Sequence, residues 1–95
     1  TSLRALGGLA LEVGDAEGAA GFYQRLTVLA PADVDALQKL GVAQGLAGRS
    51  AEAVETLRQA LALAPDDHRV RELVRLLEGG ARPAASREPN LPPAP

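Results

Sequence analysis

The side chains able to carry out chemistry are few and scattered along this 95-residue chain. His68 is the only histidine, and it follows Asp66 and Asp67 in a stretch typical of the start of a helix. A metal site would need further ligands at suitable spacing, and the sequence offers none. There is no cysteine, so a thiolate site and a disulfide framework are both excluded, and the redox compartment is left open. The sequence therefore predicts no metal, no cofactor and no catalytic residue.

Other polar or glycine-rich positions have simpler structural roles. Asp15, Asp33 and Ser50 each come directly before a helical pattern, where such side chains accept hydrogen bonds from the first free N–H groups. Gly7-Gly8 and Gly79-Gly80 lack the strand-turn-helix context and the lysine of a phosphate-binding loop. We therefore expect helix caps and close contacts at these positions, and we do not expect an enzyme.

The charges are balanced and dispersed. Ten basic and twelve acidic residues give a net charge of −2, without a long block of one sign. Nucleic-acid footprints and polybasic membrane patches both need concentrated Lys and Arg. No apolar run approaches the roughly 20 residues that cross a bilayer as a helix. The expected partner is therefore a protein or peptide, with no nucleic acid and no membrane insertion.

Helices must position whatever site exists. Apolar residues recur at three- and four-residue spacing over residues 2–13, 16–29, 34–47, 51–63 and 68–78. Gly14 and Gly48 can adopt the left-handed backbone that ends a helix, and each of the Ala30-Pro31 and Ala64-Pro65 pairs stops one. We expect Gly79-Gly80 to end the last helix. The core side of the second helix should carry a stripe consisting of Ala19, Phe22, Tyr23, Leu26 and Leu29.

A fixed period organises these helices. Pro31 and Pro65 recur at a period of about 34 residues, a spacing typical of stacked helix-turn-helix units. Within the stretch from Val34 to Pro65, we expect Gly41 and Ala53 to face each other and allow close helix packing.

The residues on this period resemble the tetratricopeptide repeat (TPR) motif. Matching apolar, small and proline positions are Leu37, Leu40, Gly41, Ala53, Leu57, Ala60 and Pro65 in one copy, and Leu3, Leu6, Gly7, Ala19, Tyr23 and Pro31 in the other. The chain departs from the motif at Ala10 and Gln44, where the family usually has a large aromatic residue, and at Leu26, where it has a small one.

The resemblance implies an all-α, right-handed α-solenoid of antiparallel helix pairs. Its expected parts are one repeat at residues 1–31, a second at 32–65, a C-terminal capping helix at 66–80 and a disordered Pro-rich tail at 81–95. The Ala-, Gly- and Arg-rich composition, with Lys39 as the only lysine, is typical of a GC-rich bacterial genome. We therefore expect the C-terminal fragment of a bacterial TPR protein.

A solenoid of this kind binds partners on its concave side, which the first helix of each pair lines. The expected groove residues are Arg4, Gly8, Leu11, Glu12, Asp35, Gln38, Lys39, Val42, Gly45, Leu46, Arg69, Glu72 and Leu76. The leading hypothesis is a non-catalytic scaffold that holds a partner's peptide or helix there. The alternative is a structural cap or accessory module of a longer TPR protein or enzyme, without a ligand of its own. Either way, an uncovered N-terminal face predicts self-association of the isolated chain.

Overall fold

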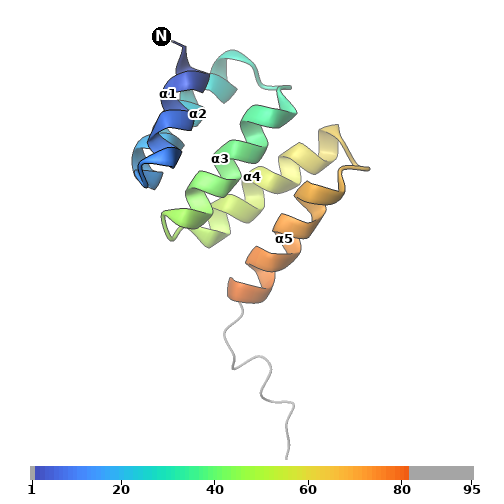
Figure 1. The fold of residues 1–95 in the computed structure, drawn as a ribbon. Helices are drawn as coiled ribbons and strands as arrows, with labels where there is room; N and C mark the ends of the chain where they lie inside the picture. Colours follow the sequence, from blue (N-terminus) through green and yellow to red (C-terminus); the bar gives the residue numbers. More distant parts are fainter. Residues whose placement is uncertain (1, 82–95) are drawn as a thin grey trace, which may run out of the picture.

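The computed structural model describes residues 2–81, all of which belong to one row of helices and their connections. The helices are α1 (Leu3–Glu12), α2 (Ala16–Leu29), α3 (Val34–Leu46), α4 (Ser50–Leu63) and α5 (His68–Ala81). Each helix runs antiparallel to the one before it and packs on it, as Figure 1 shows from blue to orange. The all-α helical-repeat prediction is confirmed. The predicted tail falls outside the described residues, except Ala81, which is the last residue of α5.

The helices begin at capping side chains, with α4 as the exception. In each cap a side-chain oxygen accepts a hydrogen bond from the backbone N–H of the third residue further along. The donor–acceptor distance is 2.8 Å for Asp15 and 3.1 Å for Asp33. These bonds satisfy N–H groups that lack a partner inside the helix. The capping residues are Ser2 of α1, Asp15 of α2, Asp33 of α3 and Asp67 of α5.

The prediction that Ser50 caps α4 is wrong. The N-cap position is occupied by Arg49, whose side chain makes no capping hydrogen bond. Ser50 is already the first helical residue, because the turn at Gly48 finishes one residue earlier than expected. Arg49 instead pairs with Glu17 of the preceding hairpin, so this position joins two helix pairs.

The two helix hairpins repeat each other in detail. Gly14 and Gly48, which hold equivalent positions in the two hairpins, have φ angles of +83° and +86° and are the only described residues with positive φ. Ala30 and Ala64, at the ends of α2 and α4, have φ/ψ angles of −136°/76° and −138°/76°. The chain therefore turns in the same way within each hairpin and leaves each one in the same conformation.

The core lies between consecutive helices in two clusters. The first contains Ala10, Ala19, Ala20 and Tyr23 from the first hairpin, together with Leu40 and Ala43 of α3. The second contains Leu37, Leu57, Ala60, Val70 and Val74. Each cluster includes residues from the next helix along the chain, so neighbouring units stabilise each other.

The structure corrects three details of the expected helices. Leu29 is 73% exposed and does not join the core stripe, because it lies in the last turn of α2. Gly41 faces Leu57 rather than Ala53, whose Cβ lies near Gly45 instead. Helix α5 continues through Gly79 and Gly80 to Ala81, since glycine lowers helix stability by only about 1 kcal/mol and Gly79 does not adopt a positive φ.

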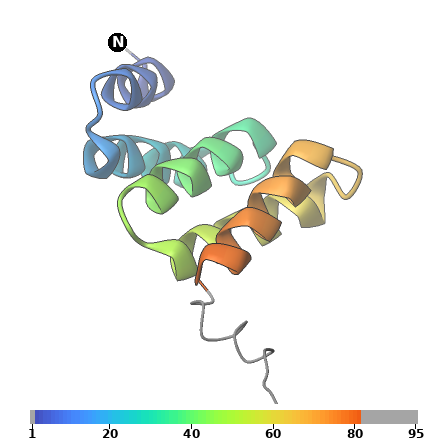
Figure 2. The ribbon, with the colours of Figure 1, turned by 60° about the horizontal axis from the view of Figure 1, so that its bottom comes forward.

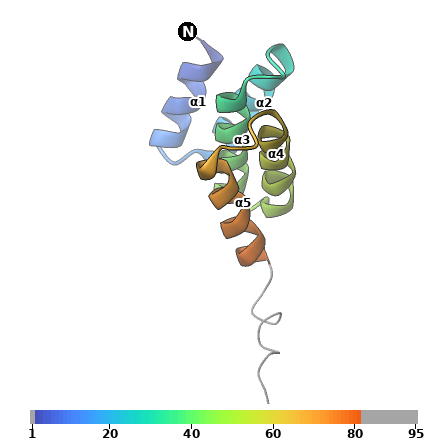
Figure 3. The same ribbon diagram turned by 90° about the vertical axis from the view of Figure 1, so that its right-hand side faces the viewer.

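The helices form two layers that position the candidate site. In Figure 2, α3 (green) and α5 (orange) lie on the same side of α4. Figure 3 shows α1 and α5 on one side of the molecule and α2 and α4 on the other. First helices and second helices of the pairs therefore present separate surfaces.

Candidate binding groove

An apolar hollow of about 250 Å³ lies between α3 and α5 over the buried side chain of Leu57. We call this hollow the groove. It is lined by Gly41, Val42, Gly45, Leu46, Leu57, Leu73, Leu76 and Leu77. Leu46 is 69% exposed and Leu76 is 62% exposed, so large apolar side chains remain in water at its rim. The groove can hold apolar side chains but has no polar group that could orient a small substrate.

Glycines shape the groove. A Cβ atom built on Gly41 would lie 2.5 Å from Leu57 Cγ, and one built on Gly45 would lie 3.2 Å from Leu77 Cδ2. Both distances are shorter than ordinary van der Waals contact, so larger side chains would displace the leucines. Glycine at these positions keeps the floor of the groove close to the helix backbones.

The structure brings part of the predicted site together. Val42, Gly45, Leu46 and Leu76 all line the groove. Four further lining residues were not predicted, because small and apolar residues on a helical stripe are expected to pack in the core: Gly41, Leu57, Leu73 and Leu77. Leu73 and Leu77 serve both purposes, since they are half-buried and also pack against the second core cluster. A four-residue recurrence of Leu along α5 was the available signal for them.

Charged residues predicted for the site lie outside the groove and neutralise each other. Arg4 of α1 reaches α3, where it pairs with Asp33 and, at 2.6 Å, with Asp35. Lys39 pairs with Asp35 at 3.1 Å. The hydrogen bond from Arg4, followed by the one from Ala36 N, lowers the pKa of Asp33, and the bond to Asp33 raises the pKa of Arg4. Because Arg4 is neutralised within the chain, it is poorly placed to hold a ligand carboxylate.

The remaining predicted residues are distributed over the helix surfaces. Gly8 and Gln38 are half-buried, and Glu12, Arg69 and Glu72 are exposed. Leu11 is half-buried against the first core cluster, and so it does not form the apolar centre of the groove. None of these six residues lines the groove.

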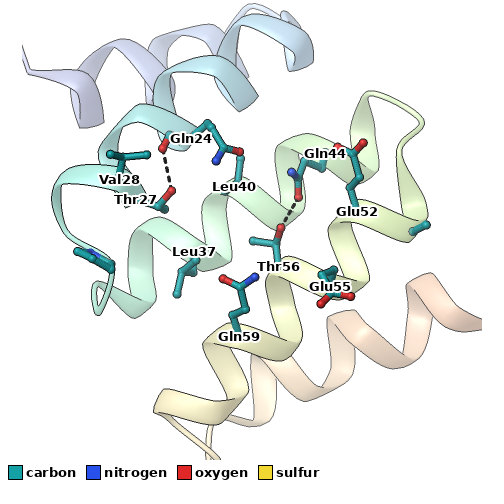
Figure 4. A pocket seen from close by; sticks show the side chains of 12 residues that line it. Gln24, Thr27, Val28, Leu37, Leu40, Gln44, Glu52, Glu55, Thr56 and Gln59 are labelled. Carbon is teal, nitrogen blue, oxygen red and sulfur yellow. Dashed lines mark hydrogen bonds between the residues drawn. The ribbon is translucent and has the colours of Figure 1, made fainter.

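A second, larger hollow of about 590 Å³ lies between α2 and α4, over α3. We call it the polar hollow. Its lining consists of Gln24, Thr27, Val28, Pro31, Leu37, Leu40, Gln44, Ala51, Glu52, Glu55, Thr56 and Gln59. Figure 4 shows Gln44 and Thr56 pointing toward each other within it. It shares no lining residue with the groove, because the two hollows use different sides of α3. This hollow was not predicted from the sequence.

The described residues set limits on other kinds of site. Within residues 2–81, no three His, Asp or Glu side chains come together in a way that could hold a metal ion. None of the helices in that range has the length and apolarity needed to cross a membrane.

Comparison with known proteins agrees with the repeat geometry. No sequence among the curated proteins matches this chain. The family model described as "Tetratricopeptide repeat" matches residues 10–77, from the last turn of α1 through α2, α3 and α4 to most of α5. Repeats of this family generally mediate protein–protein interaction and are generally non-catalytic. With its helices, turns and small-residue contacts recurring at one fixed period, the chain belongs to the tetratricopeptide repeat family.

Proposed function

We propose that this chain is a non-catalytic scaffold that binds a peptide or helix of a partner protein in the groove between α3 and α5. The observation that carries the proposal is the apolar lining of the groove. Leu46 of α3 and Leu76 of α5 both line it and are both exposed to solvent. Removing apolar surface from water contributes roughly 25 cal/mol per Å². A partner that covers these leucines would gain that energy, and an amphipathic helix is a common ligand for such a groove.

The charge pattern supports an apolar ligand rather than a peptide recognised by its terminal carboxylate. Arg4 is occupied by Asp33 and Asp35, and Lys39 by Asp35. Binding of a peptide with acidic terminal residues should therefore not depend on its carboxylate, and amidating that carboxylate should leave the affinity unchanged. A clear loss of affinity on amidation would contradict this part of the proposal.

Peptides selected by display against the full chain provide the test. We expect Leu46→Glu and Leu76→Glu to weaken a selected peptide by at least about tenfold, which corresponds to about 1.4 kcal/mol. The matched control is Leu63→Glu, which adds the same charge at a leucine that is 48% exposed on α4 and outside the groove. Equal effects of all three substitutions would reject the groove as the binding site.

A second candidate function is a structural cap without a ligand of its own. Leu9 of α1 occupies the position in the first repeat that Ala43 of α3 occupies in the second. Ala43 is fully buried in a cluster with residues of α2, whereas Leu9 is 57% exposed. The apolar side of α1, consisting of Leu6 and Leu9, is here called the N-terminal face. In this reading another helix covers that face, and the exposed Arg69, Arg71 and Arg75 form the outer surface of the solenoid.

A further inference from the structure

We propose that the polar hollow between α2 and α4 is a second binding site, which accepts a basic side chain from an extended segment of a separate partner protein. Three features of its lining carry this inference: a buried amide, two carboxylates and an apolar floor. Because the hollow shares no residue with the groove, both sites can be occupied at the same time. The proposal therefore goes beyond the function proposed above and does not depend on it.

The buried amide belongs to Gln44, which is only 6% exposed. Its Oε1 accepts a hydrogen bond from the Thr56 hydroxyl at 2.7 Å, and Thr56 is 7% exposed. The amide nitrogen of Gln44 donates no hydrogen bond to any group in residues 2–81. A buried donor without an acceptor is unfavourable. A backbone carbonyl of a bound segment would satisfy it.

The carboxylates give the hollow a negative charge. Glu52 and Glu55 line it from α4, and no Lys, Arg or His is among its lining residues. Glu55 forms no ion pair within the described part of the chain, and Glu52 has only a long contact of 3.7 Å with Arg49. The other polar lining residues, including Gln24 and Gln59, are uncharged. Complementary charge therefore favours a cationic side chain over an anionic or neutral one.

The apolar floor suits the rest of such a ligand. Leu37 and Leu40 line the hollow and are 4% and 3% exposed. The methylene stem of Arg or Lys packs well on a surface of this kind while its charged end stays near water and carboxylates. At about 590 Å³ the hollow has room for more than one side chain, so an extended segment fits better than a single ion.

The test uses the full chain and a short model peptide, acetyl-Ala-Val-Arg-Ala-Leu-amide, with its citrulline analogue as the uncharged control. We expect the arginine peptide to shift the NMR signals of the Gln44 side-chain amide, Thr56 and Glu55. The citrulline peptide should bind about two- to fivefold more weakly, in line with the loss of contacts between exposed charges. Equal binding of both peptides, or shifts confined to the groove residues, would overturn the proposal.

Substitutions in the hollow sharpen the test. Glu52→Gln and Glu55→Gln should each weaken the arginine peptide by about two- to fivefold. The matched control, Glu12→Gln on α1, should leave its affinity unchanged. The double variant Gln44→Leu, Thr56→Val replaces both partners of the buried hydrogen bond with apolar groups, a change that is often nearly neutral for stability. This variant should keep its helical signal and melting temperature but bind the arginine peptide about two- to tenfold more weakly, since the free amide is lost. Unchanged affinity in the double variant would contradict a role for the amide.

The chain's own residues 82–95 include Arg82 and Arg87 and are the other possible occupant. A variant of the 95-residue chain with Arg82→Ala and Arg87→Ala separates the two sources. If the occupant is a separate partner, the signals of Gln44 and Thr56 in the free variant match those of the parent chain. If they move without any peptide, the occupant is the chain itself and the proposal of a separate partner is wrong.

Discussion

Gly41 lies against Leu57 in the second hairpin in the same way that Gly7 lies against Tyr23 in the first. A Cβ atom on Gly41 would be 2.5 Å from Leu57 Cγ, and one on Gly7 would be 2.6 Å from Tyr23 Cε2. Leu57 and Tyr23 are buried, with exposed fractions of 0% and 1%. Each hairpin is therefore built around one glycine that makes room for one large side chain.

Substituting Gly41 with alanine should destabilise the chain. Overpacking against buried Leu57 costs about 1–3 kcal/mol, and the gain in helix propensity offsets at most about 1 kcal/mol of that. We expect a net loss of up to about 2 kcal/mol in the free energy of unfolding, measured by urea denaturation. The matched control is Gly21→Ala in α2, where no side chain beyond the two adjacent residues and no backbone outside the surrounding helix turns lies within 4 Å of the added carbon, and it should stabilise the chain. Equal effects of the two substitutions would show that the close contact is unimportant.

Asp15 and Ser50, which lie at the start of the second helix in each hairpin, should differ in how much they contribute to stability. Asp15→Ala removes the hydrogen bond to Gly18 N and should cost about 0.5–2 kcal/mol of stability. Ser50→Ala should change stability by less than about 0.5 kcal/mol, because Ser50 is inside α4 and its side chain does not cap it. Thermal melts of both variants provide the measurement. A large loss of stability in Ser50→Ala would show that the Ser50 side chain does cap α4.

The pair formed by Arg4 and Asp33 predicts a pH-dependent contribution to stability. The pKa of Asp33 is lowered in the folded chain, mainly by the hydrogen bond from Arg4. The resulting stability is complete above the pKa of an unfolded aspartate, about 3.9, and is lost as the pH falls through the lower folded value. Arg4→Met should therefore destabilise the chain at neutral pH and raise the pKa of Asp33.

The parent chain and the Arg4→Met variant should have similar free energies of unfolding in strong acid, where Asp33 is protonated in both. Carbon-detected NMR titration of the Asp33 carboxyl group measures the pKa directly. Arg25→Met on α2 removes another exposed arginine that forms no ion pair within residues 2–81, and it should leave Asp33 unaffected. An unchanged Asp33 titration in Arg4→Met would rule out the ion pair as the cause.

The N-terminal face should promote self-association. Leu9 is 57% exposed at a position that is buried in the next repeat, so covering it with a second chain removes apolar surface from water. We expect the average mass in analytical ultracentrifugation to rise with concentration and Leu9→Glu to reduce that rise. Leu63→Glu on α4 should have a smaller effect. If the chain stays monomeric at every concentration, the prediction that the N-terminal face promotes self-association is wrong.

Much of this fold could be predicted from short-range chemistry. Gly14, Gly48 and the Ala-Pro pairs determine local backbone geometry, so the hairpins follow from residues close together in sequence. The start of α4 was misplaced because Arg49 and Ser50 are adjacent and either can stand at the boundary. The better-capping residue type does not occupy the cap.

The site was harder to predict because one side chain can serve two surfaces. Leu73 and Leu77 fit the apolar stripe of α5, and periodicity alone does not show that the same residues line the groove. The polar hollow was missed although Gln44 interrupts an apolar stripe. Its hydrogen-bond partner, Thr56, belongs to another helix, and only the packing of α3 on α4 brings them together.

The matching backbone angles at Ala30 and Ala64 have a consequence for how this molecule could be lengthened. Both residues direct the chain into the next helix along the same path, and each helix packs mainly on its neighbours in sequence. A duplicate of residues 32–65 spliced in after Pro65 should therefore extend the row by one hairpin, which enters and leaves through the same backbone turns as its neighbours.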